Sequence, residues 1–188
     1  MTHPEDNVAP AILAAVADLT PRFDARALSV FIEELVRWNP QLGLVSKKNT
    51  SHVVARLIRE SVSLWDFVTE AVTQPGAVSA SAPSAALHRP IRRVIDIGSG
   101  AGFPGLVWSL LDPTLSIELL ERKERKVAFL ERAAARTGNQ RVSATAEDLR
   151  VFARRSDRKA AFDLAVMMAV ADPSDIAPAV EPLLCVPG

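Results

Sequence analysis

Apolar residues recur at helical spacing through the first third of the chain. Leu28, Phe31 and Leu35, for example, fall on one stripe that a helix would turn inward. Thr50 or Ser51 stands where a helix cap is expected, because either hydroxyl can accept a hydrogen bond from a free amide of the first turn. The pattern predicts helices over residues 11–19, 25–38 and 52–71.

A change of composition then divides the chain. From residue 74 to residue 90 the sequence reads QPGAVSASAPSAALHRP, which is rich in small residues and interrupted by proline. Such composition is typical of a flexible connection. We therefore expect a helical region over 1–73, a linker over 74–90 and a second domain over 91–188.

After this connection the pattern alternates between strands and helices. Short apolar stretches predict strands at 93–97, 116–120, 141–144 and 161–167. Helices are expected at 104–111 and 124–137, and a helix or turn at 178–184. Strands that alternate with helices at this spacing indicate parallel βαβ units. The predicted fold class is therefore α/β, with helices on both faces of a buried parallel sheet.

Composition narrows the class of protein further. The 22 Lys and Arg residues balance the 22 Asp and Glu residues, so any contact with nucleic acid must be local. The single cysteine excludes an internal disulfide, and with three scattered histidines it forms no metal-ligand pattern, so we expect no metal. No secretory pattern opens the chain and no apolar run reaches membrane-spanning length. We expect a cytoplasmic protein with no membrane contact.

The stretch VIDIGSGAGFPG, at 94–105, joins the first predicted strand to its helix. Gly98, Gly100 and Gly102 permit positive φ angles and let a ligand approach bare backbone amides. In an open parallel sheet this first turn is the usual ligand cradle. Asp96 lies two residues before the first glycine, and the G-x-G-x-G spacing departs from the G-x-G-x-x-G of dinucleotide sites.

A second acid, Glu121, ends the next predicted strand. A carboxylate there can accept hydrogen bonds from ribose hydroxyls. Two acids beside a glycine turn favour a ligand made of adenosine attached to an amino acid. Two other interpretations stay open: Asp96 caps the following helix, or Glu121 belongs to a solvated helix start within ERKERK.

Three motifs carry a resemblance to a known family. DIGSGAGFPG, LLERKERKVAFL and ATAEDL at 144–149 follow in order the cofactor motifs of class I S-adenosylmethionine-dependent methyltransferases. The GFPG ending, with LVRWNPQLGLVS and ARLIRESVSL, resembles the small-subunit ribosomal RNA guanine-N7 methyltransferases of the glucose-inhibited division protein B type. The resemblance covers 28–184 and implies a Rossmann-like methyltransferase domain that uses S-adenosylmethionine to methylate guanine N7 in 16S ribosomal RNA.

The resemblance also implies roles for individual residues. The turn residues expected to line the methionine and ribose of the cofactor are Gly98, Ser99, Gly100 and Gly102. Asp96 would hold the turn or meet the amino group through water, and Glu121 would bind the ribose. Ala146 and Glu147 would lie beside the adenine. Phe103 and Pro104 would shape the floor between cofactor and substrate. Further candidates for substrate contact are Arg56 and Met168, and no catalytic residue is assigned.

The chain departs from the family pattern at several positions. Gly43-Leu44-Val45 stands where the family has Asn-Leu-Thr, Leu57 replaces a histidine, and Met167-Met168-Ala169 replaces Ser-Arg-Ala. The family sequence continues past the equivalent of Pro187-Gly188 into two more strands, so we expect this sheet to lack its last strands. The lost polar groups leave two alternatives open, a methyltransferase redirected to a small molecule and a non-catalytic cofactor-binding paralogue.

The expected partner is ribosomal RNA or the 30S particle, with a small-molecule substrate as the alternative. Two basic runs are candidates for an RNA-facing patch, although charge runs are also typical of solvated surface. These residues are Arg122, Lys123, Arg125, Lys126, Arg154, Arg155, Arg158 and Lys159. Guanine N7 has an available lone pair, so its methylation needs alignment and exclusion of water rather than a general base.

Overall fold

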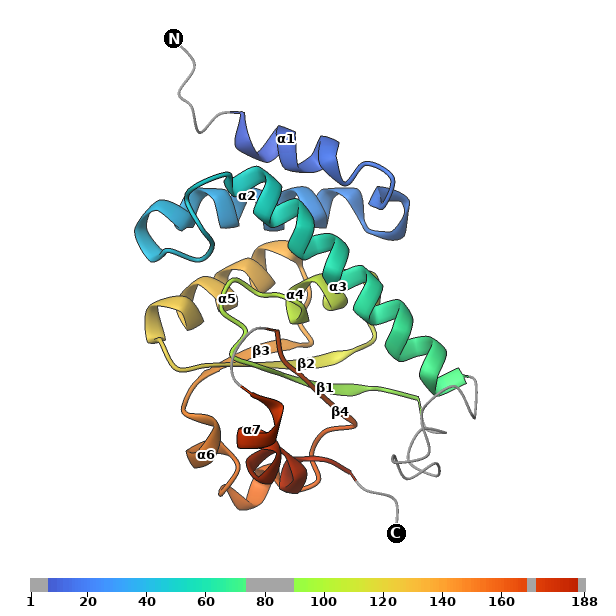
Figure 1. Ribbon diagram of the computed structural model, residues 1–188, viewed down its shortest axis with the longest axis vertical. Coiled ribbons are helices and arrows are strands. Elements are labelled where there is room, and N and C mark those ends of the chain that lie inside the picture. Colours follow the sequence, from blue (N-terminus) through green and yellow to red (C-terminus); the bar gives the residue numbers. More distant parts are fainter. Residues whose placement is uncertain (1–6, 74–89, 169–171, 186–188) are drawn as a thin grey trace.

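The computed structural model describes residues 7–73, 90–168 and 172–185. The linker expected over 74–90 lies outside these residues, except for Pro90. The described strands form one four-stranded parallel sheet in the order β3-β2-β1-β4. They are β1 (Arg93–Ile97), β2 (Ser116–Glu121), β3 (Val142–Ala146) and β4 (Leu164–Val166). With helices on both faces of this sheet, the predicted α/β, Rossmann-like class is confirmed (Figure 1).

The register of the sheet brings the ends of its strands together. Ile97 of β1 pairs with Leu120 of β2, and Glu121 pairs with Ala146 of β3. Because the strands are parallel, the chain leaves every strand at the same side, which we call the carboxyl edge. Strand order reverses at β1, which has β2 on one side and β4 on the other. Ligands of open α/β sheets bind at such a reversal, outside the carboxyl ends of the strands.

Helices cover both faces of the sheet in separate layers (Figure 1). On one face lie α4 (Gly105–Leu111) and α5 (Glu124–Thr137). They are covered in turn by α2 (Ala25–Leu42) and α3 (Thr50–Thr73), with α1 (Val8–Ala15) outermost. The opposite face carries α6 (Leu149–Phe152) and α7 (Pro173–Val180). Short 3₁₀ turns lie at Thr20–Arg22, Ser156–Arg158 and Glu181–Leu183.

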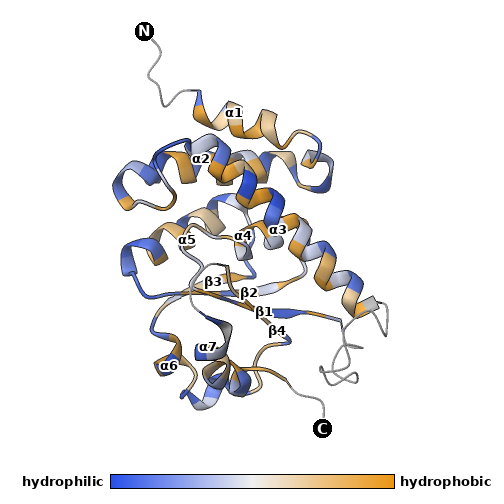
Figure 2. Cartoon of the chain, viewed as in Figure 1, coloured by the Kyte–Doolittle hydropathy of each residue, from blue (hydrophilic) through white to orange (hydrophobic). Residues whose placement is uncertain are grey.

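One apolar core joins the N-terminal helices to the sheet. The helices α2, α3 and α5 each carry apolar and polar residues along their length (Figure 2). Phe31 of α2 packs edge-on against Phe103 of the glycine turn, with ring centroids 5.6 Å apart. The indole N–H of Trp108 in α4 donates to the Ser61 carbonyl of α3 at 2.8 Å. The helical layer therefore packs directly on the segment that follows β1.

A buried carboxylate adds a polar link between the same layers. Glu34 of α2 is only 3% exposed and accepts hydrogen bonds from Trp38 at 3.1 Å and from Arg132 of α5 at 2.7 Å. Arg136 lies 3.5 Å from its second oxygen. Burial alone would raise the pKa of Glu34, but the hydrogen bonds from Arg132 and Trp38 and the two arginine charges lower it overall. Glu34 is therefore held as a charged anchor for α5.

The N-terminal helices depart from their predicted boundaries at every end except the start of α2, which continues to Leu42 instead of residue 38. The first helix ends at Ala15 instead of residue 19, and the chain then enters a 3₁₀ turn that contains Pro21. Residues 16–19 between the two elements form turns. Thr50 is the first residue of α3 instead of its cap, and its hydroxyl donates to the carbonyls of Ser46 and Lys47.

The second half departs from prediction on the face that carries α6 and α7. The strand expected at 161–167 is limited to β4, and Phe162 instead forms an isolated bridge to Leu184. The last helix begins at Pro173 rather than residue 178, after Asp172, which accepts the Ser174 N–H at 2.9 Å. The four-residue helix α6 was not predicted, because one turn is too short to display helical periodicity.

Candidate functional site

The glycine turn after β1 has the geometry that its sequence predicts. Gly98, Gly100 and Gly102 have φ angles of 72°, 54° and 91°, a region that other residues rarely occupy. The turn is closed by a hydrogen bond of 2.7 Å from the Gly102 N–H to the Ser99 carbonyl. It is tied to the neighbouring strand by another of 2.7 Å, from the Gly98 N–H to the Leu120 carbonyl. The turn is thus fixed at the reversal point of the sheet.

Asp96 lies directly beneath this turn and is fully buried. Its Oδ2 accepts a hydrogen bond of 3.0 Å from the N–H of Gly105, the first residue of α4, as the helix-capping interpretation predicts. Its Oδ1 is also buried but has no partner. Burial raises the pKa of Asp96 to about 7, the Gly105 N–H and the Ser99 hydroxyl oppose this, and the nearby charge of Glu121 adds to it. In the structure the Ser99 hydroxyl donates to the main-chain carbonyl of Asp96 at 2.8 Å, so Oδ1 keeps no donor of its own. One oxygen therefore anchors α4 and the other is left for a donor.

The sequence predicts no separate role for Gly105, the last residue of the glycine stretch. A Cβ atom at this position would lie 2.5 Å from Leu119 Cδ2 and 2.7 Å from Asp96 Oδ2. The missing side chain is therefore what allows the Gly105 amide to approach the buried carboxylate. The fourth glycine of VIDIGSGAGFPG was the available signal, since close backbone approach is one of the reasons for glycine.

Glu121 connects the glycine turn to the segment that follows β2. Its Oε2 accepts the Gly100 N–H at 3.2 Å, and its Oε1 accepts the Lys123 N–H at 3.0 Å. Glu121 is the last residue of β2, whereas α5 begins only at Glu124. The carboxylate therefore belongs to the carboxyl edge and faces the turn, and each oxygen keeps a second lone pair for a ligand.

The segment after β3 lies beside the same two features. Ala146 pairs with Glu121 in the register, and the Glu147 N–H donates to the Glu121 carbonyl at 3.2 Å. The carboxyl edge thus brings together Asp96, the glycine turn, Glu121, Ala146 and Glu147. These residues come from three strands that are separate in the sequence.

Phe103 and Pro104 are buried next to this edge. Phe103 is 6% exposed, and its ring packs against Phe31 of the helical layer. Pro104 is also buried and precedes α4. The Phe103 ring therefore links the glycine turn to the N-terminal helices.

The tentative substrate residues lie in different surroundings. Arg56 pairs with Glu60 on the exposed side of α3, at 2.5 Å. It lines a groove of about 700 Å³ that also includes Ala15 of α1 and Phe67 of α3. Met168 follows β4 at the carboxyl edge and packs partly buried against the main core.

The positions that depart from the family pattern have structural roles. Gly43 ends α2 in the left-handed conformation, with φ 58°. Val45 and Leu57 pack partly buried against the main core, as Met168 does. Apolar packing therefore accounts for Val45, Leu57 and Met168, and the helix end accounts for Gly43. Ala169 lies outside the described residues.

Several of the basic residues considered for an RNA-facing patch are paired with acids. Arg122 lies 3.7 Å from Asp148, and Arg158 donates to Glu118 at 3.2 Å. Arg155 lies between Asp157 and Glu147. These pairings reduce the net positive charge that the two runs present together.

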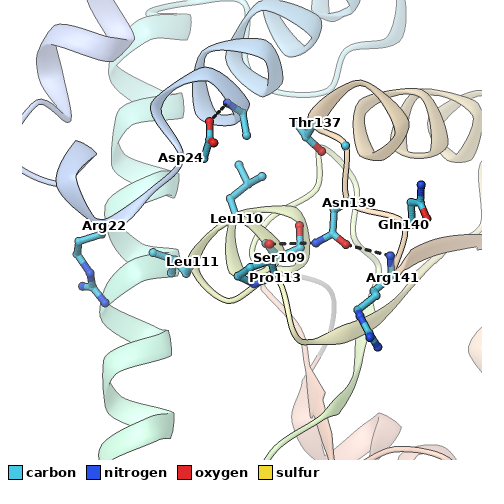
Figure 3. A pocket seen from close by; sticks show the side chains of 12 residues that line it. Arg22, Asp24, Ser109, Leu110, Leu111, Pro113, Thr137, Asn139, Gln140 and Arg141 are labelled. Carbon is cyan, nitrogen blue, oxygen red and sulfur yellow. Dashed lines mark hydrogen bonds between the residues drawn. The ribbon is translucent and has the colours of Figure 1, made fainter.

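A cavity of about 570 Å³ lies at the opposite edge of the sheet (Figure 3). Its walls come from the ends of α4 and α5, from the start of α2, and from the residues just before β2 and β3. Asn139 crosses it to donate to the Ser109 carbonyl at 3.0 Å. None of the cofactor residues expected from the sequence lines this cavity.

Within residues 7–73, 90–168 and 172–185 there is no group of three or more His, Cys, Asp or Glu residues that could hold a metal ion. No helix within them is long and apolar enough to cross a membrane.

The sequence of this chain was compared with known protein families. Residues 24–188 match the model of the GidB family, described as rRNA small subunit methyltransferase G. The chain belongs to this family. The Rossmann-like sheet, the glycine turn at its reversal point and the helical layer above it are therefore features of a GidB-family protein.

Individual relatives carry the same name. The chain is 33% identical over 135 residues to the ribosomal RNA small subunit methyltransferase G of Treponema pallidum strain Nichols, covering 67% of this chain and 52% of the relative. It is 29% identical over 174 residues to that of Chromohalobacter salexigens, covering 91% of this chain and 71% of the relative. The match to that of Moorella thermoacetica is 39% over 102 residues, covering 53% and 41%. The chain spans about half the length of most of these relatives.

Proposed function

We propose that this GidB-family chain binds S-adenosylmethionine at the carboxyl edge and transfers its methyl group to guanine N7 in 16S ribosomal RNA. The observation that carries the proposal is the buried Asp96, whose Oδ1 lacks a partner beneath a glycine turn. Buried polar atoms nearly always have a hydrogen-bond partner, so an exception beside a turn of bare backbone favours a ligand. Membership of the family and the names of the relatives support methyl transfer and a small-subunit ribosomal RNA substrate, and guanine N7 is the position that the sequence resemblance implies.

The residues of the carboxyl edge fit the chemical groups of this cofactor. Asp96 Oδ1 would accept a hydrogen bond from the amino group of the methionine part, directly or through a water. Glu121 has lone pairs left for the ribose hydroxyls after accepting from Gly100 and Lys123. The Gly98–Gly102 turn leaves room for close approach, and Ala146 and Glu147 would border the adenine. We also propose that the cofactor-binding domain is the part of the chain over 91–188, and that a linker over 74–90 joins it to the helical region over 1–73.

The bound cofactor would supply an electrophilic methyl group on a sulfonium sulfur. The protein would then need to align guanine N7 with that methyl group and to exclude water, since N7 attacks through its own lone pair. Phe103, packed on Phe31, fixes the helical layer above the edge and would limit access of water. Met168 would border the incoming base from the end of β4. No proton transfer to a protein side chain is required.

A methyl-transfer assay tests the proposal. Radiolabelled S-adenosylmethionine would be incubated with the protein and with 30S particles from a strain that lacks it, with naked 16S RNA, or with neither. We expect label in the 16S RNA as N7-methylguanine, and more with particles than with naked RNA, because the protein carries no net positive charge.

The other outcomes identify the alternatives. Label transferred only to a small molecule from a cell extract would contradict the RNA substrate and support the redirected enzyme. Cofactor binding without transfer to any acceptor would support a non-catalytic paralogue. Glu121→Gln serves as the internal control, because it should lower incorporation wherever the methyl group goes.

A further inference from the structure

Charged side chains of alternating sign form a continuous chain on the face of the sheet that carries α6. Each neighbouring pair is within 4 Å. In order, the members of this ion chain are Glu118, Arg158, Asp157, Arg155 and Glu147. Its first member lies within β2 and its last directly follows β3, so it joins the middle of the sheet to the carboxyl edge.

The ion chain is firmly anchored at the Glu118 end. Glu118 is 8% exposed and accepts hydrogen bonds from the hydroxyls of Ser143 and Thr145 as well as from Arg158. The Arg158 guanidinium carbon lies 4.9 Å from the centre of the buried Phe152 ring. A cation over an aromatic face is attracted to it, so Arg158 is held from two sides.

Arg155 transmits this anchoring to the carboxyl edge. Its Nε and Nη2 donate to Asp157 at 3.3 and 3.1 Å, and its guanidinium lies 5.7 Å from the Phe152 ring centre. The remaining nitrogen, Nη1, lies 3.6 Å from Glu147 Oε2. That oxygen is buried and has no hydrogen-bond partner, so the Arg155 charge is what compensates it.

Glu147 in turn occupies a defined position at the edge. Its N–H donates to the Glu121 carbonyl, which places its backbone beside the residue proposed to bind the ribose. The side chain of the same residue is the group that Arg155 contacts, so the ion chain ends on the residue that borders the adenine side of the proposed site.

We infer that Arg155 is a positioning residue for the adenosine half of the cofactor site, and that it acts through the carboxylate of Glu147. This inference rests on the proposed function, since it requires the cofactor at the carboxyl edge. It also gives Arg155 a role different from the RNA contact considered from the sequence. The pair is partly exposed, so its loss should weaken binding about two- to fivefold rather than abolish it.

A double-mutant cycle tests the inference by titration calorimetry with S-adenosylhomocysteine and with adenosine. Arg155→Gln should raise the dissociation constants of both ligands by the same two- to fivefold factor. The matched control is Arg154→Gln, which removes an adjacent exposed arginine and should leave both constants unchanged. In a Glu147→Gln background, Arg155→Gln should have little further effect, because its route to the ligand is already removed.

The outcomes separate this inference from the proposed function. If the unaltered protein binds neither ligand, the proposed cofactor site is wrong. If it binds both ligands and the dissociation constants of Arg155→Gln equal those of Arg154→Gln, the positioning role is wrong and the proposed cofactor site is unaffected. The inference would also be overturned if Arg155→Gln raised the dissociation constants by the same factor in the unaltered protein and in the Glu147→Gln background. Arg155 would then act on the ligand by a route that does not include Glu147. Thermal unfolding of each variant identifies any general loss of folding.

Discussion

The main-chain N–H of Gly105 donates a hydrogen bond of 3.0 Å to Oδ2 of the fully buried Asp96. This contact joins the end of β1 to the start of α4 beneath the glycine turn. Asp96 Oδ1 is buried as well and has no hydrogen-bond partner. The helix anchor and the proposed ligand acceptor are thus the two oxygens of one side chain.

Gly105→Ala tests the steric part of this relationship. An alanine in a helix is ordinarily more stable than glycine by about 1 kcal/mol. Here the added Cβ would meet Leu119 and Asp96 at 2.5 and 2.7 Å, so we expect a destabilisation of about 1–3 kcal/mol, the usual range for overpacking. Urea unfolding measures it.

Gly138→Ala is the matched control for Gly105→Ala. Gly138 ends α5 with φ 82°, and a Cβ there would meet nothing within 4 Å. Its cost should come from the backbone alone, at roughly 1–2 kcal/mol. Gly105→Ala should also weaken cofactor binding and Gly138→Ala should not. Equal binding by both variants would contradict the role given to Gly105.

The raised pKa of Asp96 predicts an unusual pH dependence of folding stability. The folded state holds the Asp96 proton up to about pH 7, whereas the unfolded chain loses it near 3.8. Between these values the folded state binds more protons than the unfolded state, so the Asp96 contribution to stability falls as pH rises. Asp96→Asn removes this contribution and keeps an acceptor for the Gly105 N–H.

Urea unfolding of the unliganded protein at pH 5 and pH 8 measures this contribution. On going from pH 5 to pH 8, the unaltered protein should lose roughly 2–3 kcal/mol more than Asp96→Asn does. Other titrating groups are common to both proteins and cancel in the comparison. If both proteins lost the same free energy of unfolding between pH 5 and pH 8, Asp96 would be ionised in the folded state throughout this range.

Glu34→Ala tests the polar link between the helical layer and α5. The change removes the acceptor of Trp38 and Arg132, and Arg132 keeps partial contact with water. We expect a loss of about 2 kcal/mol in the free energy of unfolding, as for a hydrogen-bonded charge. Glu33→Ala, next to it on the exposed side of α2, should change stability by less than about 0.5 kcal/mol. If Glu34→Ala changed the free energy of unfolding as little as Glu33→Ala does, the polar link would not contribute to stability.

Glu121→Gln tests the expected ribose contact. The substitution removes the charge and keeps an oxygen acceptor for only one of the two backbone amides, because those of Gly100 and Lys123 bond to different oxygens of Glu121. A hydrogen bond to a charged group contributes about 1.5–3 kcal/mol, so the affinity for S-adenosylhomocysteine should fall by at least about tenfold. Unchanged affinity would place the ribose elsewhere.

The elements that the sequence predicted well are those with a strong local pattern. The predicted boundaries of β1 and α5 are confirmed, because a short apolar run and a complete amphipathic repeat mark them. The shortened β4 was not predictable in this way. Phe162 pairs with Leu184, twenty-two positions further on, and only the folded chain brings them together.

The same distinction holds at the candidate site. Asp96, the glycine turn and Glu121 were found because each stands at a set position relative to a strand end. The steric role of Gly105 depends on Leu119 of β2, and the position of Arg155 depends on Phe152 and Glu147. Contacts of this kind follow from packing between elements, which spacing along the chain does not specify.

Isothermal titration with S-adenosylmethionine, S-adenosylhomocysteine and NAD, the last as a control, measures whether the carboxyl edge holds the proposed cofactor. We expect micromolar binding of the two sulfur compounds at one site per chain, weakened by Glu121→Gln, and no binding of NAD. Absence of binding by both sulfur compounds would contradict the proposed cofactor site. The glycine turn would then be a structural link between β1 and α4, and Asp96 Oδ1 would need another partner.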